Sequence, residues 1–195
     1  EKLADPQSLV WIILGILIIF CIFASPLFLN PRNLRNVFMI QPIGLGLASL
    51  GQALVVISGG IDLSVGAVIS LLTSIAAGIY QAYPEISPIY VVLIIVALGA
   101  GTGMINGFIV VKLKVTPFMA TIATMSIFQG VVLFYAKKTI GGIPRSYRFI
   151  SDGELMGIPF SIILFIAVIA LCHYLLRKNK LGKHVYAVGS DPYVS

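Results

Sequence analysis

The chain has 195 residues, of which 58% are hydrophobic and only 10% are charged, and its mean hydropathy is +1.03. An ordinary soluble domain carries about 25% charged residues, so this composition excludes that class and indicates an integral membrane protein. The net charge of +6 comes from basic residues in the links between apolar runs, which favours a topological role over nucleic-acid binding. The apolar runs do not alternate as barrel strands would, so we predict an all-α polytopic membrane protein.

Six apolar runs have the length that a helical membrane span requires. We expect spans over residues 9–29, 34–58, 63–83, 89–111, 117–136 and 160–176, followed by a cytoplasmic segment over residues 177–195. Basic residues divide almost evenly between the two sides of such a bundle. The orientation therefore rests on the dense cluster at the start of the last segment, which contains Arg177, Lys178, Lys180 and Lys183.

The second expected span is less uniformly apolar than the first, because it contains Ser49 and Gln52. Polar groups in hydrocarbon are costly unless they are hydrogen-bonded, so this helix should face protein or water. Two interpretations stay open. The polar side chains either join neighbouring helices or line a path for a polar solute.

A glycine-rich break, residues 59–66 (GGIDLSVG), separates the second and third spans. It combines one carboxylate and one hydroxyl with three glycines, a composition that favours a tight turn of the backbone: Gly59, Gly60, Asp62, Ser64 and Gly66. Asp62 is placed to cap the N–H groups of a helix starting at Leu63. Direct contact with a solute or proton is the alternative for this carboxylate.

Polar residues also run along the fifth expected span, which predicts that this helix lies inside the bundle. Gly99, Gly103 and Gly107 recur every four residues in the fourth span and predict close helix packing. Uncharged polar groups exchange hydrogen bonds with a solute without holding it tightly. The candidate pathway residues are Ser49, Gln52, Thr121, Thr124 and Gln129.

The last residues predict the start of another helix. Asp191 at a capping position is followed by Pro192 at the first helical position. Only three residues follow, so the sequence looks like the N-terminal part of a longer polypeptide.

No catalytic or metal-binding constellation is expected. Neither the two cysteines nor the two histidines have partners at ligand spacing, so we expect no metal and no cofactor. No nucleophile stands beside a base, which argues against an intramembrane enzyme. No G-x-x-x-x-G-K-[ST] loop is present, so ATP chemistry is not expected on this chain.

Four stretches resemble one known family. Residues 58–66 (SGGIDLSVG) resemble the signature of the permease subunits of bacterial ABC importers for ribose and related monosaccharides. Residues 116–125, 153–159 and 181–189 resemble further segments of that family in the same order. The resemblance covers the whole chain, and the four stretches together are specific.

The resemblance implies an inner-membrane bundle of about ten spans that translocates a monosaccharide. It also implies a second permease subunit, a separate ABC ATPase subunit and a periplasmic sugar-binding protein as partners, with membrane lipid around the bundle. By position, the segment that leads into the ATPase-coupling helix contains Gly189, Ser190, Asp191 and Pro192. Tyr193 and Val194 depart from the small residues that the family favours there.

Three alternatives remain open at this point. Permeases for branched-chain amino acids have a related architecture, with Asn in place of Asp in the glycine-rich break, so Asp62 with Ser64 favours the sugar branch. A permease for another small polar solute and a non-functional or structural permease fragment are the other two.

Overall fold

The computed structural model describes residues 6–136 and 153–190 of the chain. The chain divides into two units, residues 1–44 and residues 45–195, and each is considered by itself. Among the described residues, five helices are long and apolar enough to cross a membrane, and Leu9–Ala24 is a shorter apolar helix. The described strands are only two residues long each, so the predicted all-α polytopic class is confirmed.

The first unit contains helix α1 (Pro6–Ala24), the short helix α2 (Pro31–Arg35) and the π-helix η2 (Asn36–Ile40). The first span was expected to continue to residue 29, but α1 ends at Ala24. The reason is Pro26, which has no backbone N–H and disfavours helical geometry at the residue before it. Asn30 then caps α2 by accepting a 2.9 Å hydrogen bond from the backbone N–H of Arg32.

The widened turn of η2 comes directly before a proline. The N–H of Gln41 donates to the carbonyl oxygen of Asn36, five residues earlier. Pro42 has no N–H, and its ring would clash with a carbonyl four residues earlier in a regular helix. A π-turn just ahead of it absorbs this mismatch, so the helix continues as α3 (Gln41–Ile57) and the whole run Pro31–Ile57 can cross a membrane.

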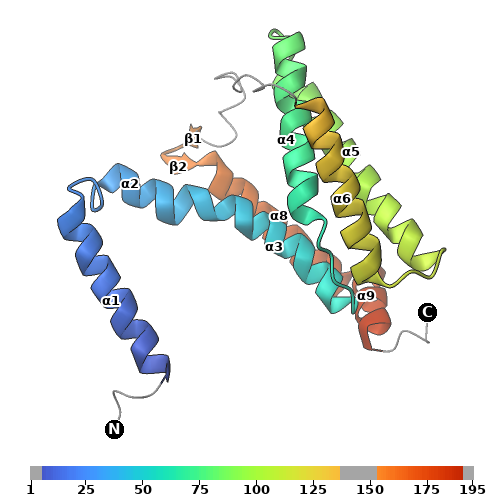
Figure 1. Cartoon of the computed structure of the whole chain (residues 1–195), viewed down its shortest axis with the longest axis horizontal. Helices are drawn as coiled ribbons and strands as arrows, with labels where there is room; N and C mark the ends of the chain where they lie inside the picture. Colours follow the sequence, from blue (N-terminus) through green and yellow to red (C-terminus); the bar gives the residue numbers. More distant parts are fainter. Residues whose placement is uncertain (1–5, 137–152, 191–195) are drawn as a thin grey trace. The chain divides into compact units, whose positions relative to one another are not determined.

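The second unit is organised around α4 (Val65–Ala82), which packs against both α5 (Pro88–Val111) and α6 (Pro117–Tyr135) (Figure 1). Ala67 and Leu71 of α4 form one buried cluster with Phe128 of α6. A second cluster joins α4 to Val91 of α5, which is fully buried. These three helices are therefore packed together along α4, and the first of the two clusters lies in the half of α4 that follows the glycine-rich break.

Large apolar side chains cover the outside of these helices. Met104 of α5 and Leu133 of α6 are 70% and 76% exposed, and many leucines, isoleucines and valines on the same helices are also exposed. Such surfaces are unfavourable in water, since burying each side chain would gain about 1.5–3 kcal/mol. They fit helices surrounded by lipid or by further protein.

A small hairpin leads into the next span. Strands β1 (Glu154–Leu155) and β2 (Ile158–Pro159) are antiparallel, with Leu155 opposite Ile158. Met156 and Gly157, which join them, have φ values of 54° and 80°. Two consecutive positive φ angles are what a two-residue type I′ hairpin requires. Helix α8 (Phe160–Lys178) follows immediately.

The last described helix, α9 (Lys180–Ser190), was not predicted from the sequence. It packs against α8 after a bend at Asn179, whose side-chain oxygen accepts a 3.2 Å hydrogen bond from the N–H of Leu181. Gly182 lies so close to the Leu176 carbonyl that a β-carbon there would overlap it. The sequence predicted a helix starting at Asp191, and that residue lies outside the described residues.

Candidate functional site at the glycine-rich break

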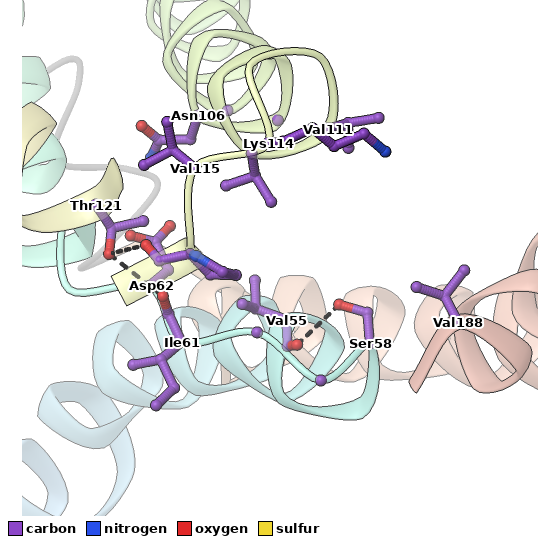
Figure 2. A pocket seen from close by; sticks show the side chains of 16 residues that line it. Val55, Ser58, Ile61, Asp62, Asn106, Val111, Lys114, Val115, Thr121 and Val188 are labelled. Carbon is purple, nitrogen blue, oxygen red and sulfur yellow. Dashed lines mark hydrogen bonds between the residues drawn. The ribbon is translucent and has the colours of Figure 1, made fainter. Parts of the chain in front are cut away.

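Parts of four helices meet around the glycine-rich break between α3 and α4. A cavity of about 600 Å³ lies there, bounded by the end of α3, the break itself, the end of α5, the start of α6 and Val188 of α9 (Figure 2). Glycine and valine residues form much of its wall, and its polar contributors include Asp62, Asn106, Lys114 and Thr121. The break is thus the point at which the ends of α3, α5, α6 and α9 come together.

The backbone of the break turns through a glycine. The N–H of Gly59 donates to the Val56 carbonyl at 3.0 Å, and the N–H of Gly60 donates to the Val55 carbonyl at 2.9 Å. These two bonds form the Schellman motif that ends α3, with Gly59 at the residue that requires a left-handed conformation. Its φ of 80° meets that requirement, which explains the glycine at this position.

Asp62 binds the start of α4. Its Oδ1 accepts hydrogen bonds from the backbone N–H of Ser64 at 2.7 Å and from the Ser64 hydroxyl at 2.6 Å. The helix begins at Val65, two residues later than predicted, and Ser64 occupies the N-cap position without making a side-chain capping bond itself. Asp62 therefore binds the N-cap residue itself, and capping of the N–H groups in the first turn of α4 by Asp62 stays a prediction.

Side chains from three neighbouring helices hold the break in place. Gln52 of α3 donates from Nε2 to the Asp62 carbonyl at 3.0 Å. Thr121 of α6 places its hydroxyl 3.2 Å from the Ile61 carbonyl, and shares its hydrogen with the carbonyl of Pro117 at 2.9 Å. Asn106 of α5 donates from Nδ2 to the Ser64 hydroxyl oxygen at 2.9 Å. Gln52 and Thr121 thus satisfy backbone carbonyls of the break, and Asn106 satisfies a side-chain hydroxyl.

The five candidate pathway residues do not gather at one surface. Gln52 and Thr121 contact the break, and Thr124 is buried with its hydroxyl 3.2 Å from the Thr121 carbonyl. Ser49 and Gln129 are exposed and do not line the cavity. A role for these five residues in conduction stays a prediction.

The remaining predicted residues belong to the break motif and to the predicted ATPase-coupling segment. Gly66 is exposed in the first turn of α4, with no atom within 4 Å of a β-carbon built there. Gly189 and Ser190 end α9, and Gly189 lies against the backbone at the end of α3. Asp191 and Pro192 lie outside the described residues.

Sequence reasoning missed Asn106, although it is 8% exposed and binds Ser64. The available signal was an amide in the middle of a strongly apolar span, where polar residues are costly and mark either packing or function. Lys114, at the edge of the cavity, was also missed. Its φ of 57° places a non-glycine residue in the left-handed region, and no sequence pattern announces this.

The described helices and the break define a polytopic α-helical membrane protein with a discontinuity between two of its spans, an architecture found in transporters. Comparison with known sequences then gives the particular family. The chain belongs to the family described as branched-chain amino acid transport system / permease component, which matches residues 35–195.

Individual relatives are sugar permeases by name. The chain is 35% identical to the ribose import permease protein RbsC of Bacillus subtilis over 181 residues, which cover 91% of the chain and 55% of that relative. It is 33% identical to the galactose/methyl galactoside import permease protein MglC of Escherichia coli K12, covering 94% of the chain and 60% of the relative. RbsC of Escherichia coli K12 is 29% identical, covering 97% and 59%.

The chain thus spans between 55% and 60% of the length of these three relatives. No solved structure matches it.

Proposed function

We propose that the chain forms part of the membrane-spanning permease subunit of a bacterial ABC importer that translocates a monosaccharide across the inner membrane. The similarity to ribose and galactose import permeases carries this proposal, because it extends over more than 90% of the chain in each case. Family membership supports a transport component rather than an enzyme. The apolar helices support a position within the membrane.

The partners follow from this proposal. A separate ATPase subunit hydrolyses ATP, a periplasmic binding protein delivers the sugar, and a second permease subunit completes the pathway. The absence of a G-x-x-x-x-G-K-[ST] loop from the sequence supports ATP hydrolysis on another chain. The segment formed by Gly189, Ser190, Asp191 and Pro192 leads toward the ATPase.

In the proposed mechanism, uncharged polar side chains bind the sugar weakly and the bundle alternates its opening as the ATPase moves. The break is suited to such a change because its carbonyls are held by side chains rather than by a helical ladder. Gln52 and Thr121 each contribute one such bond. Side-chain bonds of this kind can be exchanged for bonds to a sugar hydroxyl at modest net cost, about 0.5–1.5 kcal/mol each.

The named relatives favour a monosaccharide over a branched-chain amino acid as the solute. Reconstitution of the complete transporter in proteoliposomes tests this. We expect ATP-dependent uptake of labelled ribose or galactose when the matching binding protein is supplied, and no uptake without the ATPase. Uptake of labelled leucine but of neither sugar would show that the sugar assignment is wrong.

A further inference from the structure

The backbone of α9 touches the backbone of the break with no side chain between them. A β-carbon built on Gly59 lies 3.8 Å from the Cα atom of Gly189. A β-carbon built on Gly189 would overlap the carbonyl oxygen of Ile57 and lie 3.4 Å from the carbonyl carbon of Ser58. Position 189 therefore admits only glycine in this arrangement, because the atoms that would have to move belong to the backbone.

The other end of α9 is held just as closely. A β-carbon on Gly182 would overlap the carbonyl of Leu176 in α8, and α9 packs against α8. With 11 residues, α9 is about 16 Å long at 1.5 Å per residue. α9 thus connects the end of α8 to the break: Gly182 contacts α8, and Gly189 contacts the backbone where α3 ends and the break begins.

We propose that Gly189 is a positioning residue that makes α9 and the break move as one body. A contact made by side chains can absorb a displacement by changing rotamers, whereas two backbones in direct contact have no rotamers to change. A shift of the chain beyond Ser190 is therefore passed to Gly59, and through the break to the bonds made by Gln52, Thr121 and Asn106. This inference rests on the proposed function, in which that segment meets the ATPase.

The substitution Gly189→Ala tests the contact in the assembled transporter. We expect the complex to form and basal ATP hydrolysis to persist, while sugar imported per ATP hydrolysed falls about tenfold, within the usual range of coupling between sites. Gly101→Ala is the matched control, because Gly101 is also helical and has no atom within 4 Å of its built β-carbon. An unchanged ratio, an equal loss in the control, or loss of the assembled complex would each overturn the proposal.

A cross-link tests the rigid connection independently. Cysteines replace Ser58 and Val188, which both line the cavity, in a background carrying Cys21→Ala and Cys172→Ala. A short bifunctional thiol reagent should join them with and without nucleotide, and transport should survive the cross-link. Loss of transport on cross-linking, or a cross-link confined to one nucleotide state, would show that α9 and the break separate during the cycle.

Different measurements test the proposed function and the proposed role of Gly189. Sugar uptake by the unmodified transporter tests the proposed function alone. The ratio of uptake to ATP hydrolysis in Gly189→Ala, relative to the unmodified transporter, tests the contact between α9 and the break.

Discussion

Asn106 of α5 donates a 2.9 Å hydrogen bond to the hydroxyl oxygen of Ser64, at the entry to α4 and 42 residues earlier in the chain. The Ser64 hydroxyl donates its single hydrogen to Asp62 Oδ1 at 2.6 Å. It can therefore only accept from Asn106, which is the donor in the first bond. Ser64 is 1% exposed and Asn106 is 8% exposed. A directed chain of hydrogen bonds therefore runs from α5 through α4 to the carboxylate of the break, and the charged acceptor strengthens it.

Ser64→Ala should destabilise the protein by about 1–3 kcal/mol, because it leaves the buried Asn106 amide without its acceptor. The thermal unfolding midpoint of the purified protein in detergent measures this. The exposed Ser126, whose hydroxyl donates to the Ile122 carbonyl of its own helix, offers a matched control. Ser126→Ala should stay within about 0.5 kcal/mol of the unmodified protein. Equal midpoints for the two variants would contradict the importance of the chain of bonds.

Two glycine-to-alanine substitutions should destabilise the protein to different extents, because the new methyl group contacts backbone in one case and a side chain in the other. Gly182→Ala places a methyl group against the Leu176 carbonyl, which is backbone and cannot move aside. Gly78→Ala meets the hydroxyl end of Tyr135, a half-exposed side chain that can swing away. We expect about 1–3 kcal/mol of destabilisation for Gly182→Ala, as for overpacking in a core, and less for Gly78→Ala. Hydrogen exchange in α9 reports the first effect locally, and the reverse order of stabilities would refute the ranking.

The pathway prediction is tested by glutamine substitutions. Gln52→Leu and Gln129→Leu should both lower sugar uptake by the reconstituted transporter, because each removes a group expected to exchange hydrogen bonds with the solute. Gln81→Leu, at an exposed glutamine near the end of α4, is the control. The unfolding midpoint separates a pathway effect from a folding effect, since Gln52 also holds the Asp62 carbonyl. Unchanged uptake in both variants would show that the pathway assignment is wrong.

The features that sequence could predict are those with a local cause. Span-length apolar runs predict membrane helices because lipid requires every backbone group to be bonded within the segment. Glycine and aspartate predict the break, because Gly59 needs a positive φ and Asp62 accepts a hydrogen bond from a residue only two positions away. Both requirements can be read without knowing the rest of the fold.

Features that depend on distant partners were not predicted. α9 contains two glycines, which lower helix propensity, and its helix is supported by contacts of those same glycines with α8 and with the end of α3. Its apolar residues Leu181, Val185 and Val188 do follow a helical spacing, and this was the signal to use. Asn106 meets Ser64 only because α4 and α5 pack together, which no local pattern in either helix reveals.

Substitution of Asp62 separates the structural role of its oxygen from a role of its charge. Asp62→Asn keeps an acceptor oxygen for the Ser64 N–H and hydroxyl, but it weakens both bonds by removing the charged acceptor. It also loses the interaction of the charge with the helix terminus, about 0.3–1 kcal/mol. Asp62→Leu removes both bonds and should cost about 1–3 kcal/mol, enough to impair folding or assembly.

Both variants are compared with the unmodified protein for unfolding midpoint, assembly with the ATPase subunit and sugar uptake. We expect Asp62→Asn to retain most of the uptake and Asp62→Leu to lose it together with assembly. If the asparagine variant assembles normally and imports no sugar, the negative charge itself takes part in transport. The carboxylate would then act on the solute or a proton, and its hydrogen bonds to Ser64 would serve to orient it for that task.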